Sequence, residues 1–102
     1  MQFENDALKT TFELPDTPTR RDILRYESAV DSRIGWSLYE RLWAGVVCMA
    51  DKWVSEPLPE LDLSALDSQD TTPAAIAVIK WASLAVFSWK ASLEERKTDP
   101  NS

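Results

Sequence analysis

The last third of the chain constrains the fold most strongly. After the pair Thr72-Pro73 comes the run AAIAVIKWASLAVFSWKASLEERK, in which apolar and small residues dominate. Threonine is a favoured helix cap and proline suits the first helical position, so the sequence predicts a helix over 73–96. Its polar stripe is narrow and consists of Lys80, Ser83, Lys90 and Glu94. A helix this apolar has to bury most of its surface.

A second apolar helix is predicted over 35–54, with Asp31 or Ser32 as its cap. Large side chains recur there at the three- and four-residue spacing of one helix face: Trp36, Tyr39, Trp43, Val46, Ala50 and Trp53. Before it, residues 18–31 interleave arginines and acids around an apolar stripe of helical period. This pattern predicts a first, amphipathic helix, which Thr17 or Thr19 caps.

The remaining segments complete the prediction of an all-α fold. Only two glycines occur in 102 residues, which argues against tight hairpins and phosphate-binding loops. Residues 1–17 are predicted to form an extended arm, because TTFELP is rich in β-branched and aromatic residues. Residues 55–72 hold five acids and no base, and predict a long acidic loop in which LSAL forms a turn. We expect a small three-helix domain over 18–96 and a disordered tail over 97–102.

Composition argues against most catalytic chemistry. The chain has no histidine and one cysteine, Cys48, which leaves no imidazole base and no thiolate metal cluster. The sequence therefore predicts no enzyme, no cofactor and no metal site. A net charge of −6 repels nucleic acids and anionic membranes, so neither is an expected partner. The first residues lack an apolar signal segment, and the longest apolar run contains Lys80, so a cytoplasmic protein is expected.

Three motifs have functional alternatives. Cys48 lies in an apolar helical stretch without an adjacent base, which favours a buried small hydrophobe over a nucleophile. The segment DLSALDSQD spaces carboxylates like calcium ligands, yet it lacks the glycine and final glutamate of an EF-hand loop, so a solvated linker is favoured. Arg20, Arg21 and Arg25 are candidates for phosphate contacts, but the neighbouring acids favour a solvated helix face.

The apolar residues exceed what a three-helix core of this size needs. Two helices with apolar residues on nearly all sides must bury both faces, and one short chain offers few layers to cover them. The excess predicts a face that binds a helix of another protein, and weak self-association of the chain alone. The predicted partner-binding residues are Trp36, Tyr39, Trp81 and Trp89.

Three stretches carry a resemblance to a known family: TTFELPDTPTRRDILRYESAV, LYERLWAGVV and TTPAAIAVIKWASLAVFSW. Over residues 11–90, the chain resembles the small tail assembly chaperones of long-tailed bacteriophages. The resemblance lies in the FELP lead, the threonine–proline helix starts, the tryptophan-rich middle helix and the acidic loop. It implies a non-enzymatic protein that coats the long helical tape measure protein in the host cytoplasm. It also implies that the protein is absent from the mature virion.

Two other functions fit the same sequence. One is a small helical connector or tail protein that stays in the virion at a fixed copy number. The other is an acidic regulatory or inhibitor protein, which acts through residues 55–72. A chaperone differs from the connector in that it exchanges during assembly and leaves the finished particle.

Overall fold

The computed structural model describes residues 1–32, 35–66 and 71–98. In chain order the elements are β1 (Gln2–Asn5), β2 (Thr10–Glu13), α1 (Arg20–Asp31), α2 (Leu38–Met49), β3 (Asp51–Ser55), the 3-10 turn η1 (Leu63–Leu66) and α3 (Pro73–Thr98). The strands form one antiparallel sheet in the order β1-β2-β3. The fold is therefore mixed α/β, and the prediction of an all-α fold is wrong. The predicted tail overlaps the end of α3, and its residues 99–102 lie outside the described part.

The N-terminal segment folds back on itself as a hairpin instead of forming an extended arm. Phe3 pairs with Phe12, and a turn over residues 6–9 joins the two strands. Asn5 shapes this turn, because its Oδ1 accepts a hydrogen bond from the backbone nitrogen of Leu8 at 3.1 Å. Lys9 adopts a positive φ of 50°. The turn thus forms with Asn5 and Lys9 and without glycine, contrary to the expectation that tight hairpins need glycine.

The predicted helix over 35–54 is shorter at both ends. Ser37 caps α2 in place of Asp31 or Ser32, and Ala50 ends it with an extended backbone. The next residues form β3 and pair with β2. Two residues of β3 lie opposite one residue of β2 where the register shifts, and Lys52 has a φ of 51° there. This bulge lets the strand follow directly after the helix.

The other two helix starts agree with the sequence. Thr19 caps α1 in a reciprocal capping box, and the hydrogen bonds from Thr19 to the Asp22 carboxylate lower the pKa of Asp22. Thr72 caps α3, since its Oγ1 accepts a hydrogen bond from the backbone nitrogen of Ala75 at 3.2 Å. The predicted turn at LSAL is η1. Local side-chain chemistry therefore sets these starts.

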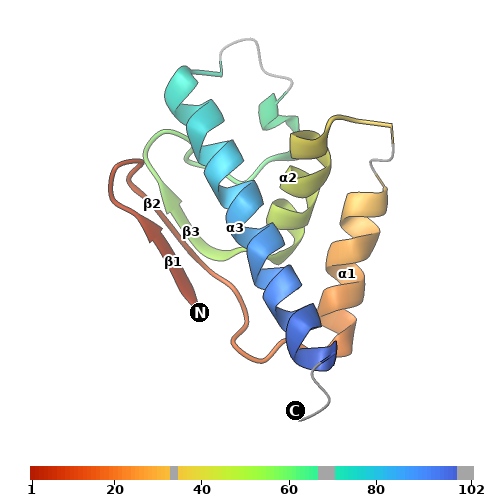
Figure 1. Cartoon of the computed structure of the whole chain (residues 1–102). Coiled ribbons are helices and arrows are strands. Elements are labelled where there is room, and N and C mark those ends of the chain that lie inside the picture. The colour runs from red at the N-terminus through yellow and green to blue at the C-terminus, as the bar shows by residue number, and fades with distance from the viewer. Residues whose placement is uncertain (33–34, 67–70, 99–102) are drawn as a thin grey trace.

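Phe12 is the centre of the core between the sheet and the helices. Its ring is fully buried and stacks on Phe3 and Trp53, while Trp81 of α3 meets it edge-on at 5.5 Å. Figure 1 shows the result: α3 crosses the molecule with the sheet on one side and α2 and α1 on the other. The hairpin thus covers one side of α3, and α2 covers the next.

Three indole groups tie irregular segments to this core through backbone carbonyls. The pairs are Trp43 Nε1 to Asp62 O at 2.7 Å, Trp53 Nε1 to Leu58 O at 2.9 Å, and Trp89 Nε1 to Pro15 O at 3.3 Å. The acidic loop is held at two of these points, and its residues Leu58, Leu61 and Leu66 pack on the core, whereas Leu63 is exposed. A large ring with one donor suits this task, because the ring fills the core while the N–H satisfies a loop carbonyl.

Candidate docking face on the last helix

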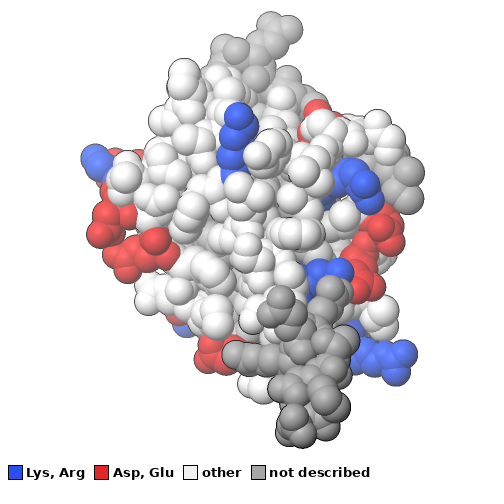
Figure 2. Space-filling view, viewed as in Figure 1, with Lys and Arg blue, Asp and Glu red and all other residues white. Residues whose placement is uncertain are grey.

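A line of apolar side chains runs along the outer side of α3. Ile76, Leu84 and Phe87 are 40%, 47% and 50% exposed, and Lys80 is exposed between the first two. At the helical repeat, the four positions fall within roughly 80° of the circumference and extend for about 16 Å. We call these four residues the α3 face. Figure 2 shows that this side of the molecule carries few charged groups, with acidic side chains gathered toward its margins.

The α3 face exists because the fold covers only part of an almost uniformly apolar helix. Between residues 73 and 93 of α3, the buried residues are Ala75, Val78, Ile79, Ala82, Ser83, Val86 and Trp89. The predicted polar stripe is right for Lys80 but wrong for Ser83, which is fully buried at the helix interface. The side chain of Glu94 lies outside the described set. The exposed side of α3 is therefore largely apolar, with Ile76, Leu84 and Phe87 on it in addition to Lys80.

The length and composition of α3 also bear on membranes. Among the described residues, Pro73–Leu93 is one helix long and apolar enough to cross a bilayer. The core helix of a soluble protein passes the same test. Here the helix packs on α2 and on the sheet, and 39% of its most apolar window is buried inside the fold.

Lys80 gives the α3 face its charge. Its Nζ lies 5.6 Å from the centre of the Tyr39 ring of α2, within the range of a cation–π attraction. No described carboxylate forms an ion pair with Lys80. The segment Pro73–Leu93 contains two lysines and no acid, although the whole chain has a net charge of −6. The α3 face is thus apolar and locally positive.

A groove opens beside the α3 face, because α1 and α3 both pack on α2. Apolar residues from the three helices line a hollow of about 230 Å³: Tyr26, Val30, Leu42 and Phe87. Ion pairs stand at its edge, with Lys90 Nζ 3.3 Å from Glu27 and Arg41 Nη2 3.9 Å from Asp31. The charges at this edge are therefore already matched within the chain.

The four predicted partner-binding residues fall into two groups. Trp36 is 44% exposed just before α2, and Tyr39 lies beside Lys80. Trp81 is half-buried against Phe12, and Trp89 is 5% exposed. The structure brings Tyr39 to the α3 face and directs Trp81 and Trp89 into the core instead.

Sequence reasoning missed the three apolar members of the α3 face. A signal for them was present in the helical spacing. Lys80 is a charged residue in the middle of the apolar run, so it marks the side of the helix that faces solvent. Ile76 and Leu84 lie one turn to either side of it and therefore on the same side. Phe87 lies one further turn along the same side. Aromatic content drew attention to the tryptophans, although Trp89 is 5% exposed and Trp81 is half-buried in the fold.

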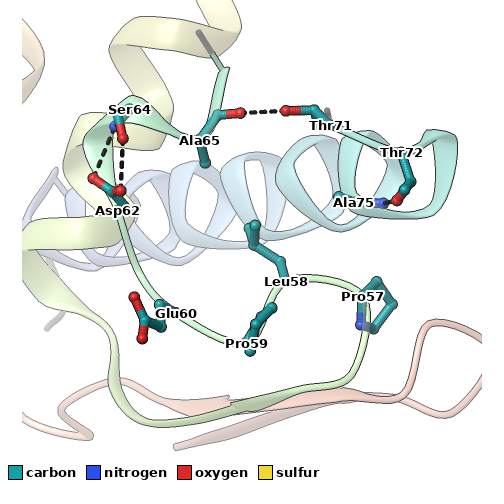
Figure 3. Close-up of a pocket in the computed structure, with 10 residues that line it drawn as sticks. All are labelled: Pro57, Leu58, Pro59, Glu60, Asp62, Ser64, Ala65, Thr71, Thr72 and Ala75. Carbon is teal, nitrogen blue, oxygen red and sulfur yellow. Dashed lines mark hydrogen bonds between the residues drawn. The ribbon is translucent and has the colours of Figure 1, made fainter. Parts of the chain in front are cut away.

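The acidic loop encloses a second hollow of about 330 Å³ near the start of α3 (Figure 3). The Asp62 carboxylate accepts hydrogen bonds from Ser64 Oγ at 2.6 Å and from Ser64 N at 3.0 Å. These bonds lower the pKa of Asp62. Thr71 Oγ1 donates to Ala65 O at 2.7 Å and closes the other side. These hydrogen bonds thus stabilise the conformation of the loop itself.

Groups with reactive potential are sparse in the described residues. Cys48 is half-buried, and its Sγ lies 3.8 Å from the carbonyl oxygen of Arg25. No cluster of three or more potential metal ligands occurs in the part of the chain that the structure describes. The chain matches no known family model, no curated protein and no solved structure. The α3 face groups three exposed apolar side chains around one lysine on a single helix, and this combination is suited to binding.

Proposed function

We propose that the protein is a non-enzymatic tail assembly chaperone of a long-tailed phage. It holds the helical tape measure protein through the α3 face and keeps that long chain soluble during assembly. The proposal combines the family resemblance of the sequence with the exposed apolar line on α3. That line is the observation on which the proposal depends.

The shape of the α3 face favours a helix as the bound element. Its side chains form a straight ridge about 16 Å long, close to three helical turns. A ridge of this kind packs into the groove between side-chain rows of another helix. The adjoining groove between α1 and α3 adds Val30 and Leu42 as further apolar contacts. A partner helix laid along α3 would cover residues that the fold itself leaves at 40–50% exposure.

Acidic surface elsewhere on the protein fits the same role. Exposed carboxylates lie on the hairpin and on the acidic loop, including those of Glu4, Asp6, Glu56 and Glu60. A coat of such molecules around an apolar helical chain would present negative charge to solvent, which favours solubility.

Co-expression with the tape measure protein of the same phage tests the proposal. The variant Leu84→Glu with Phe87→Glu places two charges on the α3 face, at side chains that are 47% and 50% exposed. We expect it to fold but to lose co-purification and to leave the tape measure protein insoluble. Leu24→Glu is the matched control, because Leu24 is 54% exposed on α1. This control should behave like the wild type.

Two results would reject the chaperone function. One is a folded Leu84→Glu/Phe87→Glu variant that still solubilises the tape measure protein. The other is wild-type protein that remains in finished particles at a fixed copy number, which would establish the connector function instead.

A further inference from the structure

We propose that the α3 face selects a partner helix that carries a carboxylate opposite Lys80, flanked by apolar residues one turn away on each side. This inference rests on the proposed function and specifies the chemistry of its partner. Lys80 then serves as the specificity-determining residue of the α3 face.

The charge distribution of α3 supports a carboxylate on the partner. The helix supplies two lysines and no acid between Pro73 and Leu93, in a chain that is otherwise acidic. Lys90 is already paired with Glu27 at 3.3 Å. Lys80 forms no ion pair with a described carboxylate, and among the described residues its charge lies over the face of the Tyr39 ring.

Burial of Lys80 on binding makes the affinity depend on the charge of the partner residue opposite it. Lys80 lies between Ile76 and Leu84, so a helix that covers those two residues also removes water from around the ammonium group. A buried charge without an opposite partner strongly disfavours binding, whereas a close charge pair across an interface is favourable. A partner with a neutral or basic residue at this position therefore binds more weakly than one with an acid.

A second copy of the chain is a poor occupant of the same face. A two-fold dimer brings identical surfaces together, so each Lys80 would meet the α3 face of the other copy. That face offers no carboxylate, because Pro73–Leu93 contains none. The net charge of −6 on each copy adds repulsion. The observations thus favour an acidic amphipathic helix from another protein.

The arrangement of the face also sets the pattern that the partner must show. Lys80 is one helical turn from Ile76 and one from Leu84, and Phe87 lies nearly one turn beyond. The matching helix carries its acid inside an apolar stripe and not at the stripe's edge. This pattern distinguishes it from an ordinary amphipathic helix, whose acids lie on the solvent side.

Binding of labelled synthetic helices to the full chain tests the inference. Peptides of roughly 20 residues, long enough to form helices, share one leucine stripe and differ only at its central position, which is Glu, Gln or Lys. Fluorescence anisotropy gives their affinities. We expect the Glu peptide to bind about tenfold more tightly than the Gln peptide, and the Lys peptide to bind most weakly.

Two variants separate the charge from the fold. Lys80→Met keeps an unbranched side chain in the helix and should abolish the preference for the Glu peptide over the Gln peptide, because no ammonium group then faces the peptide carboxylate. Arg20→Met removes one positive charge from the exposed start of α1 and should keep the preference. The measured quantity is the ratio of affinities, which a purely structural role of Lys80 would leave unchanged.

Other outcomes overturn the inference in recognisable ways. Equal affinities for the three peptides, or a preference that survives Lys80→Met, reject the role of Lys80 but leave the chaperone function standing. Failure of all three peptides to bind, together with an unimpaired Leu84→Glu/Phe87→Glu variant in co-expression, rejects both proposals. Binding to neutral phosphatidylcholine vesicles in place of the peptides, or a dimer in sedimentation that Lys80→Met strengthens, assigns the face to a different occupant.

Discussion

Replacing Gly45 by alanine would test how tightly α1 packs on α2. Gly45 is buried inside α2, and a Cβ there would lie 2.4 Å from Cε2 and 2.8 Å from Cδ2 of Tyr26. Carbon atoms in contact normally stay about 3.5–4.0 Å apart. The Tyr26 side chain is almost fully buried, and Lys90 lies over its ring at 5.8 Å from the centre. Any shift of the ring, including one toward the hollow that it lines beside Phe87, would disturb the contacts that bury it.

Two effects of opposite sign determine the result of Gly45→Ala. Alanine is the better helix former by about 1 kcal/mol. Against this, the helices or the ring must move by roughly 1 Å to relieve the overlap. Overpacking of this kind costs about 1–3 kcal/mol, and sometimes more. Because the overlap involves a buried ring, we expect a net loss of about 1–2 kcal/mol in the free energy of unfolding, which lowers Tm by roughly 5–15 °C.

Thermal unfolding followed by far-UV circular dichroism measures this change, and a double-mutant cycle assigns it to one contact. In a Tyr26→Leu background the overlapping ring atoms are absent. Gly45→Ala should then be neutral, or stabilising by up to about 1 kcal/mol, because only the helix propensity remains. A Gly45→Ala protein that is as stable as the wild type, or that changes equally in both backgrounds, would refute the close packing of Tyr26 on Gly45.

Two further predictions concern the core and the response to acid. Trp43→Ala should lower the free energy of unfolding by about 3–5 kcal/mol in chemical denaturation, because the ring is fully buried. Trp53→Ala should lower it visibly less, because that ring is partly exposed. Equal losses for the two variants would contradict this. The pKa values of Asp22 and Asp62 are lowered from 3.8, so their contribution to stability is present above that pH and is lost as the pH falls through the lower folded values. The wild-type Tm should therefore fall on acidification below about pH 4. The double variant Asp22→Asn/Asp62→Asn should show a smaller fall over the same pH range. Identical dependence of Tm on pH in the two proteins would contradict a contribution from these carboxylates.

The helix starts at Thr19 and Thr72 were predictable because their causes are local. A threonine cap, a proline in the first turn and an acid three residues on act within one turn of the chain. The turn at LSAL was predictable for a similar reason, since its flanking segment holds prolines and acids that do not extend a helix. These features depend on neighbours in the sequence, so the sequence alone carries them.

The strands were missed because their cause is not local. Residues 50 and 53 continue the helical apolar spacing of α2, and no glycine or proline lies between Met49 and Pro57. Pairing with β2 decides the matter, since Thr10 and Ser55 are 45 positions apart and join through their hydroxyl groups at 2.9 Å. Periodicity cannot distinguish a short strand from the end of a helix when both bury the same residue, here Trp53.

The glycine argument failed for a different physical reason. It treated positive φ as a property of glycine, yet Lys9 and Lys52 adopt it at 50° and 51°. Each lysine also forms an ion pair across the sheet region, with Glu56 at 3.2 Å and with Glu13 at 3.1 Å. Residues other than glycine adopt a positive φ when the surrounding strand pairing and turn geometry fix the backbone there.

The sheet also explains where the surplus apolar surface of the chain lies. The prediction that Trp81 and Trp89 bind a partner rests on rigid aromatic rings, which supply most of the energy in such contacts. In the fold, the hairpin supplies Phe12 to cover Trp81, and the segment after β2 supplies the Pro15 carbonyl to Trp89. Covering that side of α3 leaves the opposite side without a layer.

What remains on that opposite side is a ridge with a single charge. The close contact of Gly45 with Tyr26 matters here, because it holds α1 near α2 and so sets the position of the groove wall beside Phe87. A looser α1 would still leave α3 exposed, but it would displace the groove wall relative to Lys80. If the α3 face binds a partner helix as proposed, the packing of α1 on α2 should therefore affect that binding. Gly45→Ala should therefore weaken binding of the Glu peptide even at temperatures where the variant is fully folded. Unchanged affinity in that range would show that the packing of α1 on α2 does not affect binding at the α3 face.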